Sequence, residues 1–169
     1  MKQLWKRISD NAVLLVIVPV FLLFAIVVIP FIPFMLLYSY FNDKQFEKEY
    51  TAFLARMNGA CFFSYNSRKS SVEFARDVIV PELAPSVHIV FVNGKSVEFG
   101  DDSKHVSTML SRIKERNGFP YLLKIEEGKV IDLSVNNQFY SIMMGRKSIM
   151  PLLERMNSFF SAASQKSSE

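Results

Sequence analysis

The longest apolar stretch of the chain runs from Ala12 to Phe41, thirty residues without a charged side chain. About 20 apolar residues in a helix cross the roughly 30 Å hydrocarbon core of a bilayer. A cleavable secretory signal has a shorter apolar core followed by a small-residue cleavage site. We therefore predict a membrane anchor over residues 12–41, preceded by a short basic N-terminus over residues 1–11.

Three prolines interrupt this run, Pro19, Pro30 and Pro33. As a single helix the run would be about 45 Å long, which is too long for one crossing and too short for two. One interpretation is a spanning helix over about residues 11–29, kinked near Pro19, followed by an interfacial aromatic segment that ends at Phe41. The alternative is a re-entrant hairpin that turns at Pro30 and Pro33, although its arms would be too short to cross.

The orientation of such an anchor depends on basic residues near the two ends of the run. Three Lys or Arg residues and the amino group precede it, and three follow it up to Arg56. This balance weakly favours a cytoplasmic N-terminus, which would place the C-terminal domain on the non-cytoplasmic side. The single cysteine excludes an internal disulfide, so cysteine usage does not identify the compartment.

Residues 42–58 alternate charged side chains with apolar ones three and four apart, which is the pattern of a helix with one apolar face. We interpret this juxtamembrane helix as a spacer that packs on the following domain. A functional alternative is that its apolar face pairs with a partner's helix or lies on lipid. The apolar positions are Phe46, Tyr50, Phe53, Leu54 and Met57.

Residues 59–160 have the length and the patterning of a single α/β domain with one core, followed by a disordered tail over residues 161–169. Short apolar runs indicate strands, helical spacing of apolar residues indicates helices, and Asn-Gly and Glu-Gly pairs indicate tight turns. The predicted order is strand 60–65, helix 67–83, strands 87–92 and 96–99, helix 103–116, strands 121–125 and 130–135, and helix 148–160.

This order, with Gly118-Phe119-Pro120 directly before a hairpin, resembles the thioredoxin-like fold. The most specific stretch is Gly118 to Val130, which is similar to the family's cis-proline, strand, Gly-containing turn and strand. The resemblance covers about residues 60–160 and implies three layers, with helices flanking a central mixed sheet. The predicted fold class is therefore α/β, an N-terminal transmembrane helix followed by a thioredoxin-like domain.

The family's redox motif, two cysteines separated by two residues, is absent from this chain. The resemblance places that motif between the first strand and its helix, where the sequence has no cysteine. A dithiol cycle needs a nucleophilic thiolate and a resolving thiol. Cys61, the only cysteine, falls instead inside an apolar strand, where a thiol is usually buried and inert. We therefore expect a redox-inactive domain.

The loop after the first predicted strand is the best candidate for a binding site. It carries two cations, and backbone N–H groups at a helix start attract phosphate or carboxylate. The resemblance implies that Pro120 approaches this loop and that a serine hydroxyl here could activate a bound thiol, as in glutathione transferases, although their helical second domain has no counterpart in the sequence. The more conservative interpretation is a serine cap with solvated cations. The candidate residues are Asn66, Ser67, Arg68, Lys69, Ser70, Ser71 and Pro120.

Sites for metals or nucleic acids are not indicated. His88 and His105 are the only histidines, and no cysteine or HExxH-like spacing supports a metal site. We interpret both as structural, and Asp101-Asp102-Ser103 as a cap for the following helix. Residues 42–169 contain 17 Lys and Arg against 15 Asp and Glu, which is not the charge surplus of a nucleic-acid-binding domain. We expect no metal, no cofactor and no nucleic-acid partner.

Basic residues cluster at residues 112–116, where a solvated helix face explains them, and at Gly145-Arg146-Lys147. The second basic cluster is flanked by apolar residues. It could contact an anionic lipid or a protein partner. Because it precedes the last predicted helix, we expect its methionine neighbours to pack in the core. The flanking residues are Met143, Met144, Ile149 and Met150.

Together these features favour a membrane-anchored, redox-inactive thioredoxin-like binding domain that acts as an accessory or assembly subunit. Its expected partners are the lipid bilayer and a membrane protein, since confinement to one membrane raises the effective concentration of two partners. The alternative is an enzyme that binds a thiol or an anionic substrate at residues 66–71. Self-association through the anchor is a third hypothesis, although the run lacks the small-xxx-small pattern that favours helix pairing.

Overall fold

The computed structural model describes residues 17, 21, 23, 24, 27–29, 31–145 and 147–161 of the chain. Its contacts divide the protein into two units, Met1–Glu49 and Tyr50–Glu169. The second unit contains all the strands of the described residues and the candidate site.

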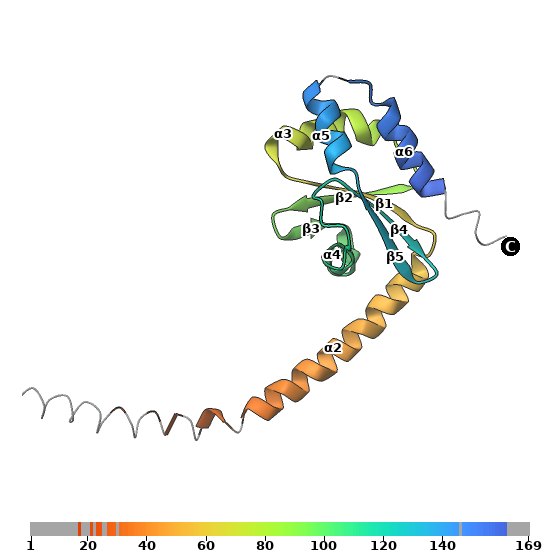
Figure 1. Cartoon of the computed structure of the whole chain (residues 1–169). Helices are drawn as coiled ribbons and strands as arrows, with labels where there is room; N and C mark the ends of the chain where they lie inside the picture. Colours follow the sequence, from red (N-terminus) through yellow and green to blue (C-terminus); the bar gives the residue numbers. More distant parts are fainter. Residues whose placement is uncertain are drawn as a thin grey trace, which may run out of the picture. The chain divides into compact units, whose positions relative to one another are not determined.

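A five-stranded mixed sheet in the order β3-β2-β1-β4-β5 forms the centre of the second unit (Figure 1). The strands are β1 (Cys61–Asn66), β2 (Val87–Asn93), β3 (Ser96–Glu98), β4 (Tyr121–Glu126) and β5 (Lys129–Ser134). β1 pairs in parallel with β2 and antiparallel with β4. The two outer strands close antiparallel hairpins with their neighbours. The central strands read as continuous apolar runs because both of their faces are covered.

The tight turns of the two hairpins contain residues that adopt the positive φ angles these turns require. In the β4–β5 turn Glu127 and Gly128 both have positive φ, 50° and 69°, as the two central residues of a type I′ turn require. In the β2–β3 turn Gly94 has φ 62° at the first central position, which a side chain would disfavour. These turns fix the registers Glu126↔Lys129 and Asn93↔Ser96.

One face of the sheet is covered by the helices drawn above it in Figure 1. These are α3 (Lys69–Phe74) with the π-helical turn Ala75–Ile79 and the 3₁₀ turn Val80–Glu82, α5 (Asn136–Gly145) and α6 (Met150–Ser161). Phe63, Leu122, Phe139, Leu152 and Met156 are fully buried in the resulting core. Because strand side chains alternate between faces, Phe62 points to the opposite side.

The opposite face is covered by α4 (Ser103–Ser111) and by the last turns of α2 (Phe31–Arg56). Phe53 is only 2 % exposed, and its ring stacks 5.1 Å from the ring of His105 on α4. Tyr50 is also buried, and the guanidinium of Arg112 lies 4.7 Å from its ring. The end of α2 therefore contributes to the core of the domain. A 3₁₀ turn at Gly100–Asp102 leads into α4.

The predicted membrane anchor needs correction. Among the described residues, no helix combines the length and the apolar character needed to cross a membrane. The apolar part of α2 covers residues 31–41, about 16 Å of helix, before Asp43 and Lys44 follow in the same helix. This finding overturns the predicted transmembrane helix in the fold class and the predicted single-pass membrane localisation. The predicted span over about residues 11–29 lies mostly outside the described residues.

The boundaries around this segment also differ from the prediction. Residues 42–56 continue the helix that starts at Phe31, so a separate juxtamembrane helix is not formed. Pro33 lies in the first turn of α2, where a missing N–H is tolerated, while Pro19 and Pro30 lie outside the described residues.

Within the domain, the predicted helix 67–83 is formed in three short pieces, and the predicted helix 103–116 ends at Ser111. α5 was not predicted. The strands match the predicted runs to within one or two residues. The predicted tail lies outside the described residues, except that Ser161 ends α6.

Candidate functional site

The loop predicted as a binding site follows directly from the sheet. Asn66 ends β1, and the amide of Ser67 donates a hydrogen bond to the carbonyl of Val92 at 2.9 Å. This bond ties the start of the loop to the end of β2. Residues 67–70 are all exposed, so their side chains are accessible to a ligand or to water.

The serine cap that we predicted is not formed. Arg68 occupies the N-cap position of α3 and makes no capping hydrogen bond through its side chain. Its carbonyl accepts the amides of Ser71 and Val72 at 2.9 and 3.0 Å. It also accepts the hydroxyl of Ser71 at 3.1 Å, so this serine donates to a carbonyl instead of accepting from a helix amide. With only six residues, α3 has little macrodipole to attract an anion.

The two cations of the loop differ in their surroundings. The guanidinium of Arg68 lies 5.5 Å from the centre of the Tyr140 ring on α5, which is within cation–π range. Lys69 is exposed at the first position of α3. Arg68 therefore helps to hold the start of α3 against α5, and Lys69 is the more accessible charge for a ligand.

Pro120 lies in a turn that is dense in hydrogen bonds. Its peptide bond with Phe119 is cis, its side chain is buried, and its carbonyl accepts the amide of Val135 at 3.1 Å. The hydroxyl of Ser134 donates to the carbonyl of Gly118 at 2.7 Å. The amide of Gly118 in turn donates to the hydroxyl of Tyr121 at 2.9 Å. These bonds join the turn to both strands of the β4–β5 hairpin.

The sheet register brings the two predicted parts of the site to the same end of the molecule. Ser64 of β1 pairs with Tyr121 of β4, so Pro120 lies one residue beyond this pair, near the end of β1. Within the described residues, no hydrogen bond joins Pro120 to residues 67–71. The loop and the proline are neighbours in the fold, but they do not form a polar site together.

Cys61 does not lie in the loop but at the start of β1, opposite Lys124 of β4. Its Sγ lies 3.8 Å from the carbonyl of Gly59. Burial raises the pKa of the Cys61 thiol, and the positive charge of Lys124 offsets part of this effect. The Lys124 ammonium is itself engaged, since it donates to the carbonyl of Phe160 at the end of α6. A thiol with a raised pKa is mostly protonated at neutral pH and is a weak nucleophile.

The two histidines lie on different elements. His88 of β2 is exposed, and its ring contacts the rings of Phe62 and Phe99 at centroid distances of 5.2 and 5.8 Å. His105 of α4 is half-buried against Phe53. The described residues contain no group of three or more His, Cys, Asp or Glu side chains that could hold a metal ion.

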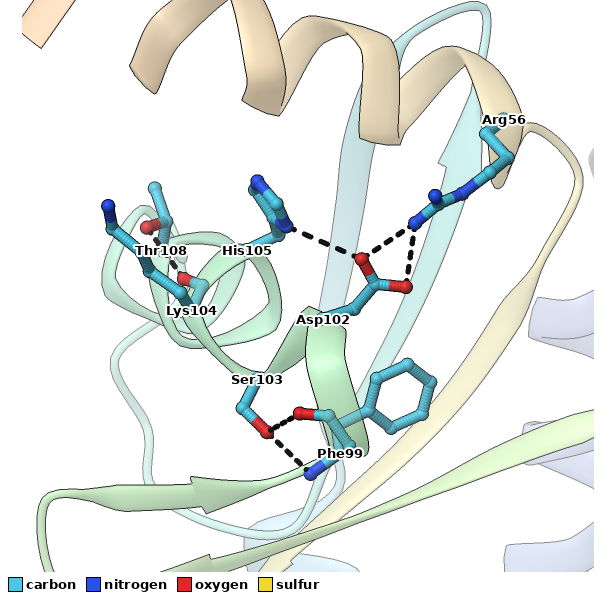
Figure 2. Close-up of polar contacts among 8 residues, drawn as sticks. Arg56, Phe99, Asp102, Ser103, Lys104, His105 and Thr108 are labelled. Carbon is cyan, nitrogen blue, oxygen red and sulfur yellow. Dashed lines mark hydrogen bonds and ion pairs between the residues drawn. The ribbon is translucent and has the colours of Figure 1, made fainter. Parts of the chain in front are cut away.

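Figure 2 shows a polar cluster that the sequence analysis missed. Nη2 of Arg56 lies 2.6 and 2.7 Å from the two carboxylate oxygens of Asp102, and Nδ1 of His105 lies 3.4 Å from one of them. Asp102 makes no capping hydrogen bond to α4. Ser103 bonds locally instead, because its hydroxyl accepts the amide of Phe99 and donates to the carbonyl of Gly100. The cluster fastens the end of α2 to α4.

A pocket of about 350 Å³ lies between α5 and α6. Met144 and Met150 are 80 % and 55 % exposed, so the prediction that the methionines near the second basic cluster pack in the core is wrong for these two. Both are adjacent in sequence to the connection between the helices. The pocket is lined by Gln138, Ser141, Ile142, Lys147, Ser148 and Pro151.

Among the described residues, the first part of α2 carries a dense group of exposed apolar side chains. From Phe31 to Phe41 the described apolar and aromatic side chains are between 48 % and 77 % exposed. They point to all sides of the helix, since they occupy nearly every position of this segment. A helix that is apolar all round is normally enclosed by other groups.

Comparisons with models of protein families, with curated proteins and with solved structures find no match to this chain.

Proposed function

We propose that this protein is an accessory binding subunit, in which a redox-inactive thioredoxin-like domain is joined to an apolar helix that a protein partner covers. The observation that carries this proposal is the exposure of the apolar side chains of α2 between Phe31 and Phe41. Exposed apolar patches of more than a few hundred Å² mark interaction sites. A helix laid into an apolar groove is a common way to cover such a surface.

The thioredoxin-like part of the proposal is supported by the arrangement of the strands. β1 and β2 are parallel, and β1, β4 and β5 form an antiparallel series. Pro120, with its cis peptide bond, directly precedes β4, as the resemblance implies. Helices lie on both faces of the sheet (Figure 1).

The binding role is supported by the surroundings of the groups that an enzyme would need. Cys61 lies at the start of a strand with a raised pKa, which does not suit a nucleophile. The hydroxyl of Ser71 is engaged with a backbone carbonyl, and the pocket of about 350 Å³ lies away from the loop, between α5 and α6. These features favour binding over thiol or anion chemistry at residues 66–71.

The test is site-specific photocrosslinking of the full-length protein in its native cells. A benzophenone amino acid is placed at Leu36, Leu37 and Tyr38, which point to three sides of α2. We expect the same protein to be crosslinked from all three positions and not from Ser158, an exposed control position on α6. The crosslinked partner is then purified and titrated with the purified chain to establish a defined stoichiometry.

A second variant distinguishes specific binding from nonspecific adhesion. Replacing Phe34, Leu37 and Phe41 by Gln removes one apolar stripe of α2 and leaves the buried residues of the domain unchanged. We expect this variant to lose the partner and to keep the same unfolding midpoint. Two results together would overturn the proposal of a protein partner. The photocrosslinks would yield adducts with lipid alone, and the purified chain would float with protein-free phospholipid vesicles.

A further inference from the structure

β5 is a long and regular edge strand. It lies at one end of the sheet and pairs with β4 over six consecutive residue pairs, from Glu126↔Lys129 to Tyr121↔Ser134, without a bulge. The other edge strand, β3, has only three residues. Edge strands present unpaired backbone groups to other chains, and proteins usually protect them.

The turn geometry shows which backbone groups of β5 face outward. A two-residue turn is closed by a hydrogen-bonded pair, here Glu126 and Lys129, and such pairs alternate along an antiparallel ladder. The N–H and C=O groups of Ile131 therefore point to β4, and those of Val130 and Asp132 point away from the sheet. Within the described residues, neither amide donates a hydrogen bond to another element.

β5 has one usual protection of an edge strand, the exposed charge of Lys129, but it lacks two others. Its sequence contains no proline, and its pairing contains no bulge. The carboxylate of Asp132 is turned toward the amides of Lys114 and Glu115, from which it accepts hydrogen bonds at 3.2 and 3.0 Å. Ile131 is 41 % exposed on the face that carries α5 and α6. The exposed edge thus combines free backbone groups with an apolar side chain.

We propose that β5 pairs antiparallel with β5 of a second copy of this chain, in the register that places Ile131 opposite Ile131 of the second copy. A two-fold axis perpendicular to the sheet requires a register centred on one residue. A register centred on Asp132 would place the two Asp132 carboxylates directly opposite each other. A register centred on Val130 would place Ile131 opposite Lys129 of the second copy. Only a register centred on Ile131 lets the outward N–H and C=O groups of Val130 bond to those of Asp132 in the second copy. The same register covers the exposed side chain of Ile131. The result is a continuous ten-stranded sheet.

The register is tested by cysteine crosslinking of the full-length protein in a Cys61→Ala background. In this pairing residue 131 faces its mate in a non-hydrogen-bonded pair, with Cα atoms about 4.5 Å apart, which suits a disulfide. Residue 129 would lie about 13 Å from its own mate, because it is offset by four residues. We expect Ile131→Cys to form disulfide dimers under mild oxidation at least 10-fold faster than the matched control Lys129→Cys.

The backbone pairing is tested by Val130→Pro combined with Ile131→Cys. The N–H of Val130 points outward, so proline removes an intermolecular hydrogen bond and leaves the ladder with β4 intact. We expect at least a 10-fold loss of crosslinking, with circular dichroism and the unfolding midpoint showing that the domain stays folded. Equal crosslinking at positions 129 and 131, or unchanged crosslinking with proline at position 130, would overturn the proposal.

The apolar surface of α2 could also bring two copies together, so a third variant separates the two effects. Phe34, Leu37 and Phe41 are replaced by Gln in the Ile131→Cys chain. If β5 carries the association, crosslinking persists in this variant. Loss of crosslinking in this variant would show that α2 carries the self-association, and it would overturn the proposed strand pairing. The protein partner proposed for α2 is tested separately, by photocrosslinking.

Discussion

Arg56 and Asp102 form an ion pair in which one guanidinium nitrogen lies 2.6 and 2.7 Å from both carboxylate oxygens. The two residues are 46 positions apart in the sequence and join the last turn of α2 to the residue before α4. Nδ1 of His105 lies 3.4 Å from one of the same oxygens. The carboxylate of Asp102 therefore contacts two side chains and does not cap the backbone of α4. The pair therefore connects the last turn of α2 to the 3₁₀ turn that precedes α4.

The strength of this pair is expected to be modest. The side chains of Arg56 and Asp102 are 61 % and 28 % exposed, so solvent screens their attraction. A double-mutant cycle with Arg56→Ala and Asp102→Ala should give a coupling energy of about 0.5–1 kcal/mol in urea unfolding at low salt. We expect the coupling to fall in 1 M NaCl because of screening. An undiminished coupling at high salt would show that the pair acts through packing.

Phe53 should contribute much more than the ion pair beside it. It is 2 % exposed and stacks on His105, whereas Phe41, in the same helix, is 66 % exposed. Phe53→Ala should lower the free energy of unfolding by about 3–5 kcal/mol, because it leaves a cavity beneath α2. The matched control Phe41→Ala should change it by less than about 0.5 kcal/mol. Similar losses at both positions, measured by urea unfolding, would contradict the assignment of Phe53 to the core.

The strands and hairpins could be predicted from the sequence because their signals are local. Buried apolar runs define β1 and β4, and the Glu127-Gly128 pair supplies the positive φ angles of the β4–β5 turn. α5 was missed because its buried face carries only Phe139 and Ile142, which is too short a pattern to indicate a helix.

The candidate site was less predictable because its contacts are long-range. A carboxylate next to a helix start is typical of a cap, yet Asp102 pairs with Arg56, and no local spacing indicates that contact. The exposure of Met144 and Met150 also depends on how α5 and α6 pack, not on their own sequence. Conversely, the absence of any cysteine from the predicted loop could be seen directly in the sequence.

The buried hydroxyl of Ser64 is expected to lower the free energy of unfolding. It is fully buried in β1, and its hydroxyl has no hydrogen-bond partner among the described residues. Burying an unpaired hydroxyl costs about 1–3 kcal/mol, so Ser64→Ala should leave stability unchanged or raise it by about 1 kcal/mol.

The matched control for Ser64 is Ser134, which is also buried but donates to the carbonyl of Gly118 at 2.7 Å. Ser134→Ala should lower the free energy of unfolding by about 1 kcal/mol, because it removes this bond and leaves the carbonyl unsatisfied. Thermal and urea unfolding of both variants give the comparison. A clear loss of stability in Ser64→Ala would indicate that its hydroxyl is satisfied by bound water.

The Cys61 thiol gives the domain a specific dependence on alkaline pH. Burial raises its pKa in the folded state, and Lys124 lowers it by a smaller amount. A group whose folded pKa is raised contributes stability that is fully present below the unfolded pKa, about 8.5 for a thiol, and lost as pH rises through the folded pKa. The stability of the wild-type chain relative to Cys61→Ala should therefore decline above about pH 8.5 and stay constant below it.

Alkylation kinetics test the same pKa independently. The rate of Cys61 modification by iodoacetamide should rise with pH along a curve displaced to higher pH in the native protein than in urea, since the thiolate is the reacting species. Lys124→Met should displace the native curve further, because it removes the positive charge that lowers the pKa. Identical native and unfolded curves would mean that the thiol is as well solvated in the fold as in the open chain, and they would remove the physical basis for an inert Cys61.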